Sequence, residues 1–324
     1  MLKFRTLIAA LVAACTLGAL AAPAHAQPQW PQRSVKFILP FGAGSATDIA
    51  ARLLSERLTA RWGKPVVIEN KPGGDGLVAI NAFISANDDH VLLYASSASF
   101  LAHPYTQEKL PYDLVRDLAP IARVTDTVLS VSVPASSNIK SIAEFVKLSQ
   151  AAPEKYNAAG AAGLPEFTLD AFLKTENLKI TKVPYRDVVQ AGRDLMEDRI
   201  QFLLSSIAIM TAPAEAGKVR ILAIAARQRS AIFKDIPSVA EAGYPGLAVE
   251  TTAGLYGPKD MPLELRKRIG ADVVAAAKDP DVTAKISSTG QDVRPGGPEE
   301  LAATIAQQTA NTAAVAKILG MEKK

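Results

Sequence analysis

The chain has 324 residues, of which 48% are hydrophobic and 21% charged, and its formal net charge is +4. The charges are scattered along the chain, which excludes nucleic acid as an expected partner. There are one cysteine and three histidines, so a disulfide framework is excluded, and no Cys or His pair has the spacing of a transition-metal site.

The N-terminal 26 residues predict an export signal. Two basic residues precede an apolar run over 7–22, and a small-residue cleavage site follows it. The run is short for a membrane-spanning helix, so we expect cleavage after Ala26 and a mature periplasmic chain. A lipoprotein-like box that ends at Cys15 is the alternative, in which that cysteine is acylated.

Strand-like apolar runs alternate with helical patterns along the roughly 300 residues that remain, which suffice for two domains. This alternation predicts an α/β fold with a largely parallel sheet. The pattern from Ser141 to Glu144 predicts a capping box. Strands are expected at 35–39, 66–68, 91–94 and 128–131, and helices at 49–58, 141–150, 188–197, 263–278 and 299–319.

Two lobes are expected, although no Pro/Gly/Ser-rich linker separates them. We therefore expect strands that cross between the lobes near Val128 and Thr252. These crossings make the first lobe discontinuous, with residues 27–127 plus 252–324, and insert the second lobe, 128–251, between its two parts.

Two strand-to-helix junctions consist almost entirely of small residues, one over Phe41–Asp48 and one over Asn157–Gly163. Each follows a short stretch that can form a strand and precedes an apolar-periodic helical pattern, so each would offer free backbone N–H groups and the positive end of a helix dipole. Together they predict a cleft that binds a carboxylate.

Enzymatic interpretations find little support in the same residues. The Gly42-Ala43-Gly44 run lacks the third glycine of a dinucleotide-binding loop, because Thr47 stands there. Ser45 lies outside a G-x-S-x-G nucleophile elbow. His90 and His103 stand beside Asp88-Asp89 and Pro104, as is typical of loop residues rather than of bases or ligands.

The ordered set of motifs resembles the Bug family, the periplasmic solute-binding receptors of tripartite tricarboxylate transport systems. The resemblance covers essentially the whole mature chain. It implies two α/β lobes of the periplasmic-binding-protein type II kind that close on a small organic acid, without chemistry. The motifs that carry it are Leu39–Asp48, Pro65–Gly76, Leu110–Asp113, Asp117–Ile121, Val183–Arg186, Ala216–Ala223 and Pro237–Gly246.

The resemblance also implies a ligand site without catalytic residues, metal or cofactor. Phe41 is expected as an apolar wall, Ser97 and Ser205 as hydrogen-bonding hydroxyls, and Tyr185 either as a ring near the opening or packed beneath the loop. Backbone contacts with the anion are expected from Gly42, Gly44, Ser45, Ala46, Thr47 and Asp48 in one lobe and from Ala159, Gly160 and Gly163 in the other.

The expected partners are a small organic acid and the subunits of a membrane permease, with the receptor itself a monomer. Two alternatives stay open, a sensor subunit that signals to a membrane kinase and an exported hydrolase. Ser205 stands where some relatives carry an aspartate, and Thr252 where a tryptophan is usual. Glu166 either supports its helix or faces the cleft, where it would favour an amine or hydroxyl over a second anionic group.

Overall fold

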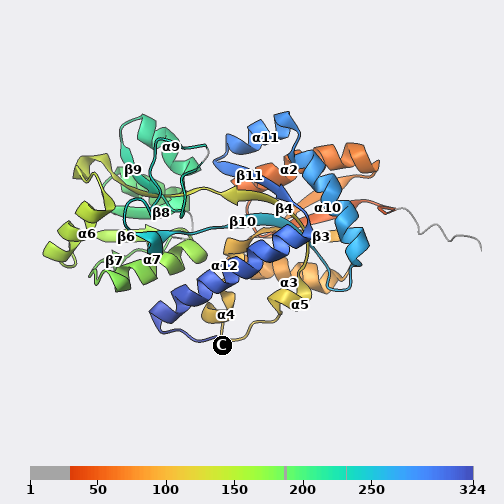
Figure 1. Ribbon diagram of the computed structural model, residues 1–324, viewed down its shortest axis with the longest axis horizontal. Helices are drawn as coiled ribbons and strands as arrows, with labels where there is room; N and C mark the ends of the chain where they lie inside the picture. The colour runs from red at the N-terminus through yellow and green to blue at the C-terminus, as the bar shows by residue number, and fades with distance from the viewer. Residues whose placement is uncertain (1–29, 186–187, 231, 324) are drawn as a thin grey trace, which may run out of the picture. The chain divides into compact units, whose positions relative to one another are not determined.

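The computed structural model describes residues 30–185, 188–230 and 232–323, and Arg33–Lys324 forms one compact unit (Figure 1). The predicted signal, its cleavage site and Cys15 lie outside the described residues. None of the helices in the described ranges combines the length and the apolar character that a membrane span needs.

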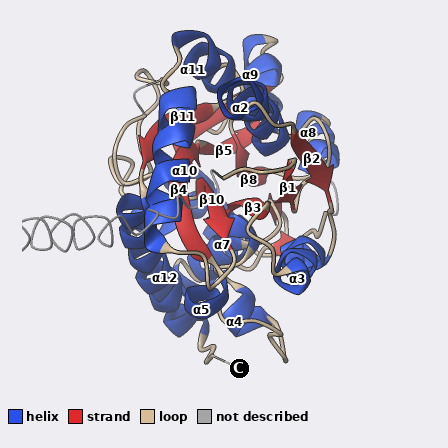
Figure 2. Cartoon of the chain, turned by 90° about the vertical axis from the view of Figure 1, so that its right-hand side faces the viewer, coloured by secondary structure: helices blue, strands red, loops and turns tan. Residues whose placement is uncertain are grey.

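The first sheet has six strands in the order β11-β4-β10-β3-β1-β2. Figure 2 shows β2 at one side of this sheet and β4 and β11 toward the other. Its strands are β1 (Val35–Leu39), β2 (Val66–Asn70), β3 (Val91–Ser96), β4 (Ala119–Thr127), β10 (Thr252–Gly257) and β11 (Gln291–Gly296).

The second sheet has five strands in the order β7-β6-β8-β5-β9. These are β5 (Leu129–Pro134), β6 (Asn157–Gly160), β7 (Thr181–Lys182), β8 (Phe202–Ser206) and β9 (Val219–Ile224). Two sheets with helices packed on them make this an α/β fold, in agreement with the class expected from the sequence.

Helices follow most strands. In the segments before and after the second sheet they are α2 (Ala46–Trp62), α3 (Leu77–Ala86), α4 (His103–Thr106), α5 (Leu114–Asp117), α10 (Leu263–Ala277), α11 (Pro280–Ser287) and α12 (Pro298–Leu319). Within the second sheet's segment they are α6 (Ile142–Ala151), α7 (Leu164–Thr175), α8 (Val188–Met196) and α9 (Ala208–Glu215). Four short 3₁₀ turns are η1 (Gly74–Gly76), η2 (Ser97–Ser99), η3 (Ala135–Ser137) and η4 (Pro245–Leu247).

The prediction of a largely parallel sheet is wrong, because both sheets are mixed. In the first, β1 pairs in parallel with β2 and β3, whereas β10 is antiparallel to β3 and β4, and β11 is antiparallel to β4. In the second, β6 is parallel to β7 and β8, and β5 is antiparallel to β8 and β9. The reversed strands are β10 and β11 in the first sheet and β5 in the second. Of these, β5 and β10 stand where the chain enters the second sheet and returns to the first, so their direction follows from the path and not from the local pattern.

The helix cap predicted at Ser141 is confirmed. Its hydroxyl accepts a hydrogen bond from the Glu144 N–H at 3.1 Å. The second half of the box differs, because the Glu144 carboxylate accepts from the Lys140 N–H at 2.8 Å, one residue earlier than expected. Both bonds satisfy N–H groups at the start of α6, which otherwise lack helical partners.

The chain passes directly from one sheet to the other. β4 ends at Thr127, β5 begins at Leu129, and the return to the first sheet comes at Thr252. One hydrophobic core includes residues of both sheets, and α12 packs against both β4 and α7. Figure 1 shows α12 running in front of the first sheet and down toward α7. The division into two lobes at these crossings stays a prediction.

Candidate ligand-binding site

The first loop, residues 40–45, joins β1 to α2 and ends in a regular helix cap. Ser45 is extended at the cap position, and its hydroxyl accepts from the Asp48 N–H at 3.2 Å. The N–H groups of Ala46 and Thr47 have no hydrogen-bond partner among the described residues. This helix start therefore offers two unpaired donors and the positive end of a 17-residue helix.

The Asp48 side chain stabilises the first loop by hydrogen bonds. Its side chain is buried, and the carboxylate accepts from the Gly44 N–H at 2.8 Å, from Arg52 Nε at 2.9 Å and from Asn70 Nδ2 at 2.8 Å. Burial alone would raise the pKa of Asp48, but its hydrogen bonds, led by that of Arg52, hold the pKa below its ordinary value. Contact of Asp48 with a ligand stays a prediction, whereas its support of the loop is direct.

The open face of the first loop is formed by Gly42 and Gly44. A Cβ built at either position would meet no atom within 4 Å. Gly44 has φ +84°, a conformation that favours glycine, whereas Gly42 has no such restriction. Phe41 is half-buried beside them, and its carbonyl accepts from Asn70 Nδ2 at 2.9 Å.

The second loop, residues 161–163, joins β6 to α7. The Ala161 N–H donates to the Leu204 carbonyl at 2.9 Å, which anchors the loop to β8. The Glu166 N–H donates back to the Ala161 carbonyl at 3.0 Å. In the described ranges the N–H groups of Ala162, Gly163 and Leu164 have no partner, so this junction also presents free donors.

Two predicted site glycines in this region face the protein itself. A Cβ at Gly160 would lie 2.7 Å from the Glu166 Cα, and one at Gly163 would lie 2.6 Å from the Ala98 carbonyl oxygen. Both positions are glycine because neighbouring backbone comes close. The free donors of this junction therefore lie after Gly160, and Ala159 is buried in strand β6.

Ser97 and Thr252 belong to a buried polar network. The Thr252 N–H donates to the Ser97 hydroxyl at 3.0 Å, and the Thr252 hydroxyl donates to Asp126 Oδ1 at 2.7 Å. Gln308 Nε2 of α12 donates to the same Thr252 hydroxyl at 3.0 Å. Thr252 thus ties β4, β10, α12 and the η2 turn together.

The remaining predicted site residues differ in their environment. Ser205 is fully buried at the end of β8, and its hydroxyl has no hydrogen-bond partner within the described residues. Tyr185 is half-buried, and its hydroxyl donates to Asp194 Oδ2 at 2.7 Å. This hydrogen bond ties Tyr185 to α8, and both predicted places, near the opening and beneath the loop, stay predictions.

Contacts between distant segments surround each of the two junctions. Gln291 Nε2 donates to the Ala46 carbonyl at 2.8 Å, and a Cβ on the adjacent Gly290 would lie 3.0 Å from the Ala208 Cβ at the start of α9. The η2 turn touches the second loop at Ala98 and Gly163. Two of these contacts, Gly290 with Ala208 and Gly163 with Ala98, join an element of one sheet to an element of the other.

A cavity of about 230 Å³, the side pocket, lies beside the second loop. Gly163, Glu166 and Asp170 line it from the second loop and α7, facing Ala98 and the segment that contains His103. Lys182 Nζ lies 3.0 Å from Glu166 Oε1 and 2.8 Å from Asp170 Oδ2. Glu166 therefore lines this cavity and pairs with Lys182, while support of its helix and a place in the ligand cleft stay predictions.

Charge in the side pocket is set by these pairs. Burial would lower the pKa of Lys182, but hydrogen bonds with Asp170 and Glu166 outweigh it and raise the pKa, so the ammonium stays charged. Burial lowers the pKa of His103, whose Nδ1 lies 2.7 Å from the Tyr112 hydroxyl and whose Nε2 lies 3.1 Å from the Asp75 carbonyl. His103 is therefore neutral at pH 7.

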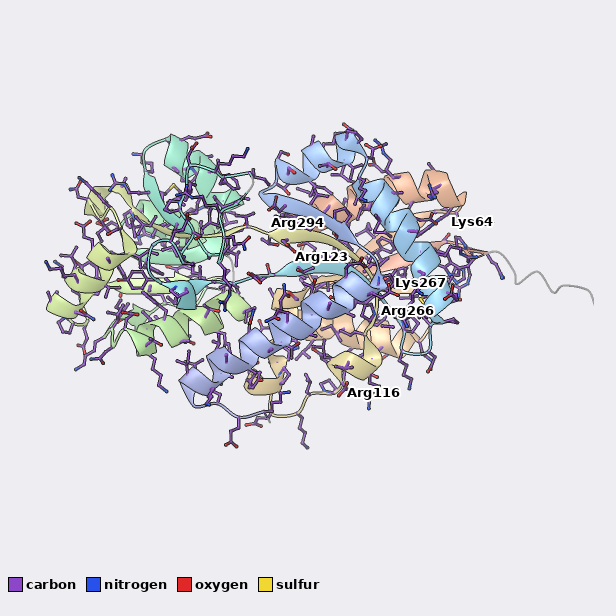
Figure 3. All side chains as sticks on the ribbon, in the orientation of Figure 1. Lys64, Arg116, Arg123, Arg266, Lys267 and Arg294 are labelled. Carbon is purple, nitrogen blue, oxygen red and sulfur yellow. The ribbon has the colours of Figure 1, made fainter. Side chains whose placement is uncertain are left out.

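A larger groove of about 580 Å³ lies along the crossing strands and α12. Figure 3 shows Arg123 of β4 and Arg294 of β11 on adjoining strands here. Arg123 pairs with Asp126, and Arg294 with Asp292 at 3.2 Å, so these cations are offset by acids of their own strands. None of the predicted site residues is among those that line this groove.

Nothing in the sequence alone marks Lys182, Gln291 or the contribution of His103 to the side pocket. Lys182 lies in a two-residue strand and Gln291 at the start of β11, where no local pattern marks a site. A lone lysine or glutamine carries no motif, and only the fold brings each to its partner.

A family model described as tripartite tricarboxylate transporter family receptor matches residues 50–321. The chain belongs to this family. The resemblance inferred from its motifs is thereby confirmed, and the family and fold are those of solute-binding receptors.

The matches to similar proteins cover nearly the whole chain. A UPF0065 protein of Bordetella bronchiseptica is 30% identical over 299 residues, which are 92% of this chain and 89% of that protein. The structure of MatC from Rhodopseudomonas palustris with bound malate is 26% identical, with a TM-score of 0.77, and the match covers 88% of this chain and 99% of that one. Rpa4515 from R. palustris with adipate is 25% identical, with a TM-score of 0.79 and coverage of 90% and 99%.

Proposed function

We propose that this receptor is a periplasmic protein that captures a small carboxylate between two lobes and delivers it to a membrane permease. The observation that carries the proposal is the pair of helix starts with unpaired N–H groups, at Ala46 and Thr47 and at Ala162 to Leu164. Such donors together with the helix dipole bind anions.

The ligands of similar proteins support a short acid. MatC carries malate and Rpa4515 carries adipate, and both are small carboxylates. The second loop of this receptor has no hydroxyl side chain over 161–163, so backbone N–H groups would be its donors there. One carboxylate suits this arrangement better than the three of a tricarboxylate.

The proposal includes export of the chain to the periplasm. The family is one of receptors whose relatives include periplasmic proteins, and the N-terminal pattern predicts cleavage after Ala26, with acylation at Cys15 as the alternative. Ser205 and Ser97 are proposed as hydroxyl groups near the ligand, with Phe41 as the apolar wall.

Replacing Ala46 by proline tests the carboxylate site. Proline at the first helical position is well tolerated, and the extended Ser45 before it suits a following proline. The change removes one unpaired N–H and keeps the carbonyl that Gln291 binds. A hydrogen bond to a charged group contributes about 1.5–3 kcal/mol, so affinity should fall at least about tenfold.

The measurement is calorimetric titration of refolded, ligand-free protein with malate, adipate and a panel of other short acids. Ala46→Ser retains the N–H and serves as the control. A folded Ala46→Pro protein that binds its acid as tightly as the control would exclude this helix start from the site.

A further inference from the structure

Gln291, the first residue of β11, is fully buried although its side chain is a polar amide. Burying an amide costs free energy unless its polar atoms are hydrogen-bonded. Its Oε1 accepts from the Thr125 hydroxyl at 2.8 Å, and its Nε2 donates to the Ala46 carbonyl at 2.8 Å and to the Thr289 hydroxyl at 3.1 Å. One bond of this satisfied amide therefore reaches the first turn of α2.

The Ala46 carbonyl and the Thr47 N–H belong to one peptide group. Because this group is planar and trans, its C=O and N–H bonds point in opposite directions. The hydrogen bond that Gln291 donates to the oxygen therefore fixes the direction of the N–H on the other side. It also polarises the peptide group, which makes the Thr47 N–H a stronger donor.

Thr47 carries two unpaired donors in a buried position. The residue is only 7% exposed, yet neither its N–H nor its hydroxyl has a hydrogen-bond partner among the described residues. An unsatisfied buried donor costs free energy that a bound acceptor recovers. The helix dipole favours an acceptor that carries negative charge. The peptide group that Gln291 holds is thus the one whose N–H has most to gain from an anion.

Gln291 is itself held by the strands at the crossing. β11 is antiparallel to β4, with Gln291 opposite Thr127. The N–H of Val128 donates to the carbonyl of the adjacent Gly290 at 3.2 Å. The support of the first α2 peptide therefore comes from paired strands, 245 residues further along the chain, and not from the first loop.

We propose that Gln291 is a positioning residue of the carboxylate site, which directs and strengthens the Thr47 N–H as a donor to the bound acid. This inference rests on the proposed function. Gln291 acts through the Ala46 carbonyl and not by touching the acid, because both polar atoms of its amide already have partners within the protein.

Gln291→Met tests this role by calorimetric titration of the ligand-free receptor with malate, adipate, succinate and glutarate. Methionine is unbranched and of similar length, but it offers no donor to Ala46. The acid that binds wild type most tightly should lose affinity by about fivefold, because one hydrogen bond to a charged group is weakened. Gln308→Met is the matched control, since this second buried glutamine bonds Thr252 and not α2, and its affinity should stay within about twofold of wild type.

A spectroscopic signature separates positioning from general destabilisation. In heteronuclear NMR, the Thr47 amide proton should move downfield when the acid saturates the receptor. This shift should be clearly smaller in Gln291→Met and unchanged in Gln308→Met. Thr125→Val keeps Gln291 but removes the bond that orients its amide oxygen, so it should reduce affinity and shift in the same direction. Thr125→Val carries the test if Gln291→Met does not fold.

The outcomes separate this inference from the proposed function. A folded Gln291→Met protein with the affinity or the full Thr47 shift of wild type would overturn it, as would equal losses in Gln308→Met. Wild-type behaviour of Thr125→Val, where Gln291→Met does not fold, would do the same. If wild type binds an acid but the Thr47 proton does not shift, the positioning role fails while carboxylate binding stands. If none of the four acids binds wild type, the proposed function fails and this inference fails with it.

Discussion

Replacing Thr252 by valine should destabilise the receptor through its buried polar network. Valine keeps the shape of threonine and removes the hydroxyl that donates to Asp126 and accepts from Gln308. Thr252 is fully buried, and Gln308 is 4% exposed. The other amide atom of Gln308, Oε1, is buried without a partner among the described residues, so the substitution leaves the whole amide unpaired.

The magnitude follows from which groups lose their partner. An unsatisfied buried amide costs about 1–3 kcal/mol. Asp126 is 30% exposed and keeps its ion pair with Arg123, so losing the hydrogen bond from the Thr252 hydroxyl to Asp126 adds only about 1 kcal/mol. We therefore expect Thr252→Val to lower the free energy of unfolding by about 2–4 kcal/mol.

Urea denaturation of wild type, Thr252→Val and Thr252→Ser measures this difference. Serine keeps the hydroxyl and loses one buried methyl group, which costs about 1 kcal/mol. Valine must therefore be clearly worse than serine. If Thr252→Val is as stable as Thr252→Ser or more so, the hydrogen bonds of the Thr252 hydroxyl do not stabilise the fold, and the argument from unsatisfied buried groups is wrong.

Three further predictions address the loops, the acid stability and the N-terminus. Gly160→Ala should cost about 1–3 kcal/mol in urea denaturation, because its Cβ meets the Glu166 backbone, whereas Gly42→Ala, in open space, should change stability by less than about 0.5 kcal/mol; equal effects would contradict the geometry. Hydrogen bonds from Arg116 lower the pKa of Asp117 from 3.8 to about 2, so its stabilisation is present above about pH 4 and lost toward pH 2, and Asp117→Asn should flatten the fall of the unfolding midpoint in that window. Intact-mass spectrometry of the exported protein should give a chain that begins at Gln27, and an acylated chain that begins at Cys15 would favour the lipoprotein alternative.

The sequence by itself determined the elements whose signals are local. β1 spans 35–39 as predicted, α12 begins one residue before the predicted 299 and ends at the predicted 319, and Ser141 caps α6. Periodicity and capping depend on neighbours within a few residues, so they can be read without the fold. The small-residue junctions were identified for the same reason, because a strand, a tight turn and a helix start follow one another along the chain.

Tertiary structure alone decided the strand directions and the partners within the site. The direction of β4, β5 and β10 depends on how the chain passes between the sheets, which no local pattern records. The same holds for Gly160, where the approach of the α7 backbone leaves no space for a side chain. The side pocket is the clearest case. Lys182 lies in β7 and Glu166 in α7, and only the packing of these two elements brings the ammonium and the carboxylate together.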